Sequence, residues 1–260
     1  MDIWKYRSYI WNNAISDLKN RYAGSSLGAY WNILQPLLQI LLFTFVFSQV
    51  MVAKIPGMDS STVAFAIYLS AGFVPWISFA EFLNRGSNAF VENATYLKKL
   101  AIPEYVFVLQ IAATTTISLF ISMALLSTFV LMLGFTIGVY WLILPIVLLL
   151  FMLFGLGLVF IFASINVFFR DVSQLLQSIV QIWMWLTPIV YIEDFLPASF
   201  AQIIKYNPLY YFVNSFHQIV VYSSHPKTMD WLVMISVSLL SLIVGYVVFK
   251  NLRPEIRDVI

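Results

Sequence analysis

Six long apolar runs constrain this chain more than any other feature of its sequence. They lie at roughly 31–52, 63–83, 105–133, 139–165, 173–192 and 230–249. A helix that crosses a bilayer needs about 20 apolar residues, and in lipid it satisfies its own backbone polar groups. Only 10% of the residues are charged, against about 25% in soluble domains. We therefore predict an all-α integral membrane protein with six transmembrane helices.

The basic residues predict how these helices are oriented. Six spans place both termini on one side, and that side receives all but three of the 14 lysines and arginines. The other side receives only Lys54, Lys205 and Lys227. Short loops rich in Lys and Arg stay in the cytoplasm, so we expect both termini to be cytoplasmic. Residues 1–30 lack a short apolar region with a cleavage site, and we expect no signal peptide.

Residues 1–30 are predicted to form an amphipathic helix on the cytoplasmic membrane surface. Apolar residues such as Trp4, Ile10 and Ala14 share one helical sector, and Lys5 lies opposite, as in interfacial helices. Arg7 falls in the apolar sector. Either its stem is buried while its head reaches the lipid phosphates, or it contacts a charged lipid-linked substrate.

The segment 193–229, on the external side, is too long for a turn and too apolar for a solvated loop. Asn207 followed by Pro208 is typical of a helix start, with a capping side chain and a proline at the first helical position. A helix from there to about Tyr222 would be about 22 Å long, too short to cross a bilayer. We predict a pair of short re-entrant helices that act as a gate, with a surface loop as the alternative.

The sequence offers little for covalent chemistry. The chain has no cysteine and only two histidines, both in 193–229. It contains neither a P-loop motif nor an H-E-x-x-H motif. We therefore predict no enzyme activity, no metal site and no bound cofactor, and the net charge of +2 gives no reason to expect nucleic acid. Glu81 is the carboxylate to note, because ionisable groups inside membranes are usually functional, although its place near a helix end suits a structural role equally.

Two stripes of polar side chains follow single helix faces. Asn32, Gln35 and Gln39 form one stripe, and the other consists of Gln174, Gln177 and Gln181, each at spacing i, i+3, i+7. Such stripes either form hydrogen bonds between helices or line a hydrated passage. Four aromatic residues are candidates to offer flat faces to sugars in that passage: Trp76, Phe79, Trp185 and Tyr191.

Six motifs follow one another along nearly the whole chain. They are Arg21-Tyr22-x-x-Ser25-x-Leu27-Gly28-x-x-Trp31-x-x-Leu34-x-Pro36, Gly72-x-x-Pro75-Trp76-x-x-Phe79, Asn93-x-x-x-Leu97-Lys98-Lys99, Asn166-x-x-x-Arg170-Asp171, Thr187-Pro188-Ile189-x-Tyr191 and Asn207-Pro208-Leu209. In this order they resemble the ABC-2-type permeases of bacterial polysaccharide exporters. One departure is Glu104 after Pro103, where the family more often has a basic residue.

The resemblance implies a homodimer in the bacterial inner membrane that works with two separate ATPase subunits, which bind ATP and Mg. The cargo would be a lipid-linked polysaccharide, with O antigen the leading candidate. Lys98, Lys99, Arg170 and Asp171 would lie on the surfaces that couple to the ATPase, although the last two could instead anchor a loop at the lipid boundary. The gate would include Asn207, Pro208, Tyr210 and Tyr211, and Arg7 and Arg21 are hypothetical contacts to the lipid phosphate.

The implied organisation is one transmembrane domain over residues 1–260. It comprises the interface helix 1–30, transmembrane helices within 31–192, the gate 193–229, a sixth transmembrane helix at 230–249 and a cytoplasmic tail 250–260. The alternatives are an exporter of a small amphiphile or drug and an ion-coupled secondary transporter. A membrane-embedded transferase would need paired carboxylates or a catalytic histidine, which the predicted spans do not offer.

Overall fold

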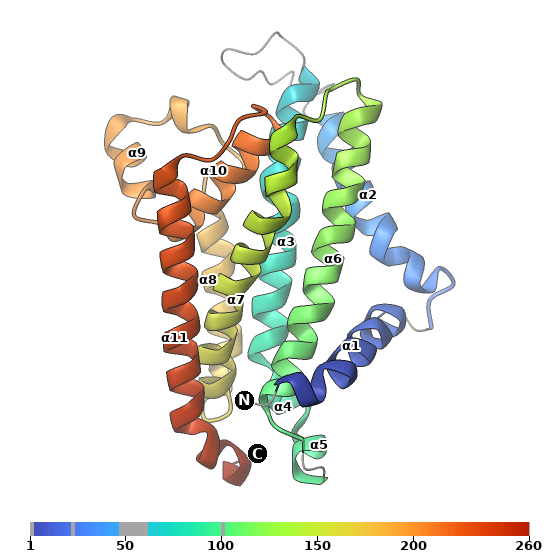
Figure 1. Cartoon of the computed structure of the whole chain (residues 1–260), viewed down its shortest axis with the longest axis vertical. Coiled ribbons are helices and arrows are strands. Elements are labelled where there is room, and N and C mark those ends of the chain that lie inside the picture. Colours follow the sequence, from blue (N-terminus) through green and yellow to red (C-terminus); the bar gives the residue numbers. More distant parts are fainter. Residues whose placement is uncertain (1–2, 22–23, 47–61, 100–101, 260) are drawn as a thin grey trace.

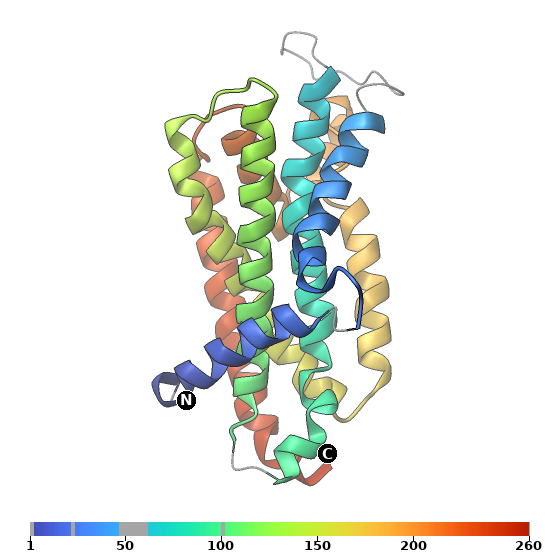
Figure 2. The same cartoon turned by 90° about the vertical axis from the view of Figure 1, so that its right-hand side faces the viewer.

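The computed structural model describes residues 3–21, 24–46, 62–99 and 102–259, and in these residues every regular element is a helix. The long helices form an up-and-down bundle (Figure 1). They are α2 (Trp31–Phe45), α3 (Thr62–Ser87), α6 (Tyr105–Met132), α7 (Leu144–Asn166), α8 (Asp171–Trp185) and α11 (Thr228–Val259), and the further helix α1 (Ile3–Asn20) lies across them (Figure 2). The short helices are η1 (Gly28–Tyr30), α4 (Ala89–Glu92), α5 (Ala94–Lys99), η3 (Val139–Ile143), η4 (Glu193–Phe195), α9 (Ala198–Ile204) and α10 (Pro208–Val220).

The bundle has two ends that carry different elements. The end with α4, α5 and the last turns of α11 is called the lower end, and the end with α9 and α10 the upper end (Figure 1). The helix α1 crosses the lower part of the bundle at a steep angle to the long helices (Figure 2). Its buried residues Ile10, Ala14 and Leu18 recur every four positions and so lie on one helix face.

Four helical segments are long and apolar enough to cross a membrane: Val63–Ser87, Tyr105–Met132, Val139–Asn166 and Thr228–Val259. They coincide with four of the six predicted spans. The other two predicted spans correspond to α2 and α8, which have 15 described residues each. The run predicted at 31–52 continues into residues outside the described part of the chain.

Two boundaries differ from the prediction. The run at 173–192 was expected to be helical throughout, but α8 ends at Trp185, because the proline at position 188 disfavours helical backbone at the residue before it. At the other boundary, 250–260 was expected to be a tail, whereas α11 continues through Pro254 to Val259. Side-chain contacts of this last stretch with the start of α6 account for its order and are described below.

Glycines allow α7 and α11 to pack backbone against backbone. A Cβ atom on Gly157 would lie 2.2 Å from the carbonyl carbon of Ser241, and one on Gly245 would lie 2.3 Å from the carbonyl oxygen of Gly157. The Ser241 Oγ donates to the carbonyl of Phe154 on the facing helix. Small residues permit this close approach where lipid offers no hydrophobic force to join helices.

An aromatic cluster forms the centre of the bundle. The ring of Phe79 on α3 lies 4.6 Å from that of Phe151 on α7, measured between centroids. Phe151 also packs against Phe212 and Phe216 of α10, with centroids 5.2 and 5.5 Å away. All four side chains are fully buried. The short helix α10 is thereby fixed to the core by its apolar side.

Candidate substrate site and coupling surfaces

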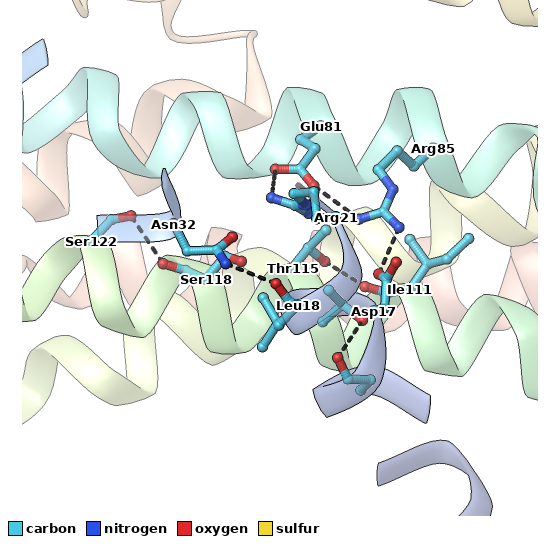
Figure 3. A network of polar contacts seen from close by, with 12 residues as sticks. Asp17, Leu18, Arg21, Asn32, Glu81, Arg85, Ile111, Thr115, Ser118 and Ser122 are labelled. Atoms are coloured by element: carbon cyan, nitrogen blue, oxygen red, sulfur yellow. Dashed lines mark hydrogen bonds and ion pairs between the residues drawn. The ribbon is translucent and has the colours of Figure 1, made fainter. Parts of the chain in front are cut away.

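Four charged side chains meet where the end of α1 approaches α3 (Figure 3). Arg85 lies 2.6 Å from an Asp17 carboxylate oxygen and 3.1 Å from a Glu81 oxygen. Arg21 pairs with both Glu81 oxygens. The four side chains are 20–32% exposed, so water screens them only in part. Two arginines balance two carboxylates, and the formal charge of the cluster is zero.

The cluster answers two questions left open by the sequence. Glu81 on α3 pairs with Arg21 at the end of α1, and Arg85 on α3 pairs with Asp17 of α1. The cluster thus joins the interface helix to α3, which gives Glu81 a structural role. Arg21, predicted to contact a lipid phosphate, is already neutralised by Glu81. Arg7 lies elsewhere: it is exposed on α1, and its guanidinium stands 4.2 Å from the centre of the Trp4 ring.

An open cavity of about 770 Å³ borders this cluster. The four charged residues form its polar side, together with Gln35 from α2. Trp76 and Phe73 of α3 and Met184 of α8 supply apolar walls. Gln35 also lines a smaller neighbouring cavity of about 60 Å³ with Gln39 and Asn32. The structure therefore brings together Gln35, Gln39, Trp76 and Arg21 from the predicted site.

The remaining predicted channel residues lie apart from this cavity. Gln174, Gln177, Gln181 and Trp185 are exposed along the outer side of α8, and Tyr191 is half-buried beyond its end. Phe79 has no exposed surface. In this chain Phe79 is therefore a core residue and does not face a passage, because its helix face packs onto α7.

The residues predicted to couple to an ATPase are exposed near the lower end. Lys98 and Lys99 end α5, while Arg170 and Asp171 begin α8. Asn166 joins the two regions: its side-chain amide donates to the Ser87 carbonyl and to Asn88 Oδ1, both at 3.1 Å. Its oxygen accepts from the Ser173 backbone at 3.1 Å. Sequence analysis found this asparagine only as part of a family motif.

A buried ion-pair cluster joins the same region to the end of α11. Glu104, directly before α6, has no exposed side-chain surface. Arg253 Nε lies 2.8 Å from one of its oxygens, and Arg257 pairs with the other. Arg257 also donates to the Ile102 carbonyl at 2.9 Å. The departure of Glu104 from the family pattern was visible in the sequence, but its partners about 150 positions away were not.

At the upper end, Asn207 caps α10 as predicted and also forms hydrogen bonds to residues at the end of α8. Its Oδ1 accepts from the Leu209 backbone at 3.1 Å and from the Trp183 indole at 2.8 Å. Its Nδ2 donates to Thr187 Oγ1 at 2.9 Å. The start of α10 at Pro208 is thus confirmed, and the same side chain fixes α10 to the end of α8. Nearby, the Tyr211 hydroxyl donates to the Lys205 carbonyl at 3.1 Å.

Comparisons with known proteins show the family of this chain. The family model described as ABC-2 type transporter matches residues 9–221. The chain belongs to this family. It is similar to two O-antigen export system permease proteins RfbA of Klebsiella pneumoniae. One is 30% identical over 74% of this chain and 72% of the relative, and the other is 28% identical over 94% and 92%. A protein of the same name from Myxococcus xanthus is 27% identical over 99% of the chain and 97% of the relative.

Proposed function

We propose that this ABC-2 family member is the permease subunit of an ATP-driven exporter, which moves a lipid-linked polysaccharide across the bacterial inner membrane. O antigen is the proposed cargo, in line with the names of the relatives. The observation that carries the proposal is the open cavity at the cluster of Asp17, Arg21, Glu81 and Arg85. It combines amide, ionic and aromatic groups in one open space.

The chemistry of the cavity suits a glycan that must move on after it binds. Gln35 can donate to and accept from sugar hydroxyls. Trp76 is almost fully buried, so the partly exposed ring of Phe73 is the aromatic wall that can meet the C–H face of a sugar. The arginines can also donate to a phosphate at the lipid end of the cargo. Because Glu81 and Asp17 neutralise them, a phosphate is attracted less strongly than by free cations. Weak binding of this kind favours passage over retention.

In the proposed exporter, α2 and α8 complete six spans, both termini face the cytoplasm, and α9 and α10 form the re-entrant external gate. Two copies of the chain would place the exposed glutamines of α8 along a shared passage. Two ATPase subunits would bind ATP and Mg and dock at the lower end, on Lys98, Lys99, Arg170 and Asp171. The hydrogen bonds of Asn166 would transmit their motion to α3, α7 and α8 together.

The proposal is tested by depleting the chain in its native host and identifying, by mass spectrometry, the lipids that accumulate. A polyprenyl- or phospholipid-linked polysaccharide is expected to build up. An unchanged glycolipid pool would refute the proposal and favour the exporter of a small amphiphile.

A variant then tests the cavity itself. Gln35→Leu removes its central amide at similar volume and should slow export when it replaces the wild-type chain. Thr128→Val, on an exposed part of α6 outside the cavity, is the matched control and should export normally. Equal export by both variants would show that the cavity does not carry the cargo.

A further inference from the structure

An open pocket of about 310 Å³ lies between the last turns of α11 and the residues that precede α6. It is found at the lower end of the bundle, where α11 ends (Figure 1). Its lining consists of Glu104, Arg253, Pro254 and Arg257. Its volume is at the lower limit for small-molecule sites, roughly 300–1,000 Å³. The proposed export mechanism gives this pocket no role.

Each arginine uses only part of its guanidinium group to hold Glu104. Arg253 donates through Nε at 2.8 Å. Arg257 donates through Nε to the other carboxylate oxygen and through one terminal nitrogen to the Ile102 carbonyl at 2.9 Å. Among the described residues, the two terminal nitrogens of Arg253 and the second one of Arg257 have no hydrogen-bond acceptor. Both side chains are nearly half exposed, so these N–H groups are open to a ligand.

The pocket carries one surplus positive charge. Two arginines face a single carboxylate, and the Glu104 side chain has no exposed surface, so an incoming anion meets the guanidinium groups first. Glu255 and Asp258 are exposed on the same turns of α11, but their spacing of three places them together on a neighbouring helix face. Neither forms an ion pair with a described residue. The pocket therefore favours a ligand with one negative charge.

One face of α11 joins these arginines to the apolar surface of the helix. Its residues recur every three or four positions and so share a face: Leu239, Ile243, Tyr246, Lys250, Arg253 and Arg257. The first three are 43–61% exposed, and an exposed apolar face on a membrane-spanning helix lies against lipid. Tyrosine is typical of the boundary between lipid and water. The basic residues thus continue a lipid-facing stripe.

The arginines lie at the depth of the lipid headgroups. The apolar run of α11 ends at Phe249, and Arg253 follows about 6 Å later at 1.5 Å per residue. The polar layer of a bilayer is about 5–7 Å thick on each side. Arg257 begins about 12 Å past the run, but side chains on a helix lean toward its N-terminus. For α11 this is the direction of the membrane, so both guanidinium groups can reach headgroup phosphates.

We propose that this pocket binds the phosphate of an anionic phospholipid, whose acyl chains lie along the exposed apolar face of α11. Arginine suits this ligand because its planar N–H groups match two phosphate oxygens at once. A zwitterionic lipid fits less well, since its ammonium group brings a positive charge to a site that already has a surplus. The bound phosphate would tie the end of α11 to the start of α6. The inference goes beyond the proposed function and does not depend on the cargo.

The test measures lipid binding to the full chain in a neutral detergent by native mass spectrometry. The probes are phosphatidylglycerol and phosphatidylcholine with identical acyl chains. Arg253→Gln removes one free guanidinium end, while Arg257 and the new amide still hold Glu104. Lys5→Gln removes one positive charge from an exposed position on α1, outside the pocket, and is the control.

We expect the wild-type chain to bind its first phosphatidylglycerol at least tenfold more tightly than phosphatidylcholine. Arg253→Gln should weaken phosphatidylglycerol binding at least fivefold, the factor implied by about 1 kcal/mol per basic group at a membrane surface. Lys5→Gln should bind like the wild type. Lys250→Gln, which leaves the ion pairs of Glu104 intact, should also weaken binding about fivefold and decides the test if Arg253→Gln does not fold.

Three results would overturn the inference. Equal affinity of the wild type for the two lipids would show that the pocket does not select an anionic headgroup. If sodium phosphate raises the unfolding temperature as much as phosphatidylglycerol does, the pocket takes a free anion. If Arg253→Gln binds lipid normally but assembles poorly with the ATPase, the pocket is a contact for that subunit. None of these results bears on the glycolipid that accumulates on depletion, so the proposed function is tested separately.

Discussion

The buried carboxylate of Glu104 allows a quantitative test of how the lower end is held together. Glu104 has no exposed side-chain surface, whereas Arg253 and Arg257 are 47% and 43% exposed. A hydrogen bond to a charged group contributes about 1.5–3 kcal/mol. Because water can solvate the half-exposed arginines, we take the lower part of that range. Arg257→Met should therefore lower the free energy of unfolding by about 2 kcal/mol.

Removing both arginines isolates the effect of the buried charge. Arg253→Met with Arg257→Met leaves Glu104 without an ionic partner. The free energy of unfolding should then fall by about 4 kcal/mol, within the range for breaking a buried ion pair. Adding Glu104→Gln to this double variant should recover about 2 kcal/mol, because the uncompensated buried charge is then gone. The order of stability is thus wild type, triple variant, double variant.

The measurement is the unfolding of the permease by denaturant in detergent micelles, followed by tryptophan fluorescence. Glu255→Gln is the control, since this exposed carboxylate lies on the same last turns of α11 and its loss should change stability by less than about 0.5 kcal/mol. A triple variant that is no more stable than the double variant would refute the reasoning, because the cost would then not come from a buried charge.

Three further predictions follow from other contacts. Asn166→Ala should reduce export several-fold while ATP hydrolysis by the complex continues, and equal losses of both activities would contradict a coupling role. Asn207→Ala should lower the free energy of unfolding, measured by thermal unfolding, by at least about 1 kcal/mol. It should also increase proteolysis at α9 and α10 in nanodiscs, and unchanged proteolysis would show that the cap does not hold α10. Gly157→Val should prevent recovery of folded protein after detergent extraction, whereas Gly134→Val, with open space around its Cβ position, should cost only the strain of its left-handed backbone.

Hydropathy found the four long spans because each satisfies its own backbone hydrogen bonds and needs only a run of apolar residues. It placed the end of α8 too late, because Pro188 disfavours helical backbone at the residue before it although the apolar run continues. The aromatic residues Phe79 and Trp76 were both predicted to face a passage. In the fold both side chains are buried, and their ring centroids lie 5.9 Å apart. Phe79 also stacks on Phe151, while Trp76 borders the open cavity.

The sequence by itself determined the membrane class, the amphipathic first helix and the start of α10 at Asn207–Pro208, since each depends on neighbours within a few residues. Only the tertiary structure decided which polar groups meet. Glu81 and Arg21 are 60 positions apart, and Glu104 and Arg257 are 153 apart. No local pattern encodes such pairs, because they form only when helix packing brings distant charges together and removes most of their water.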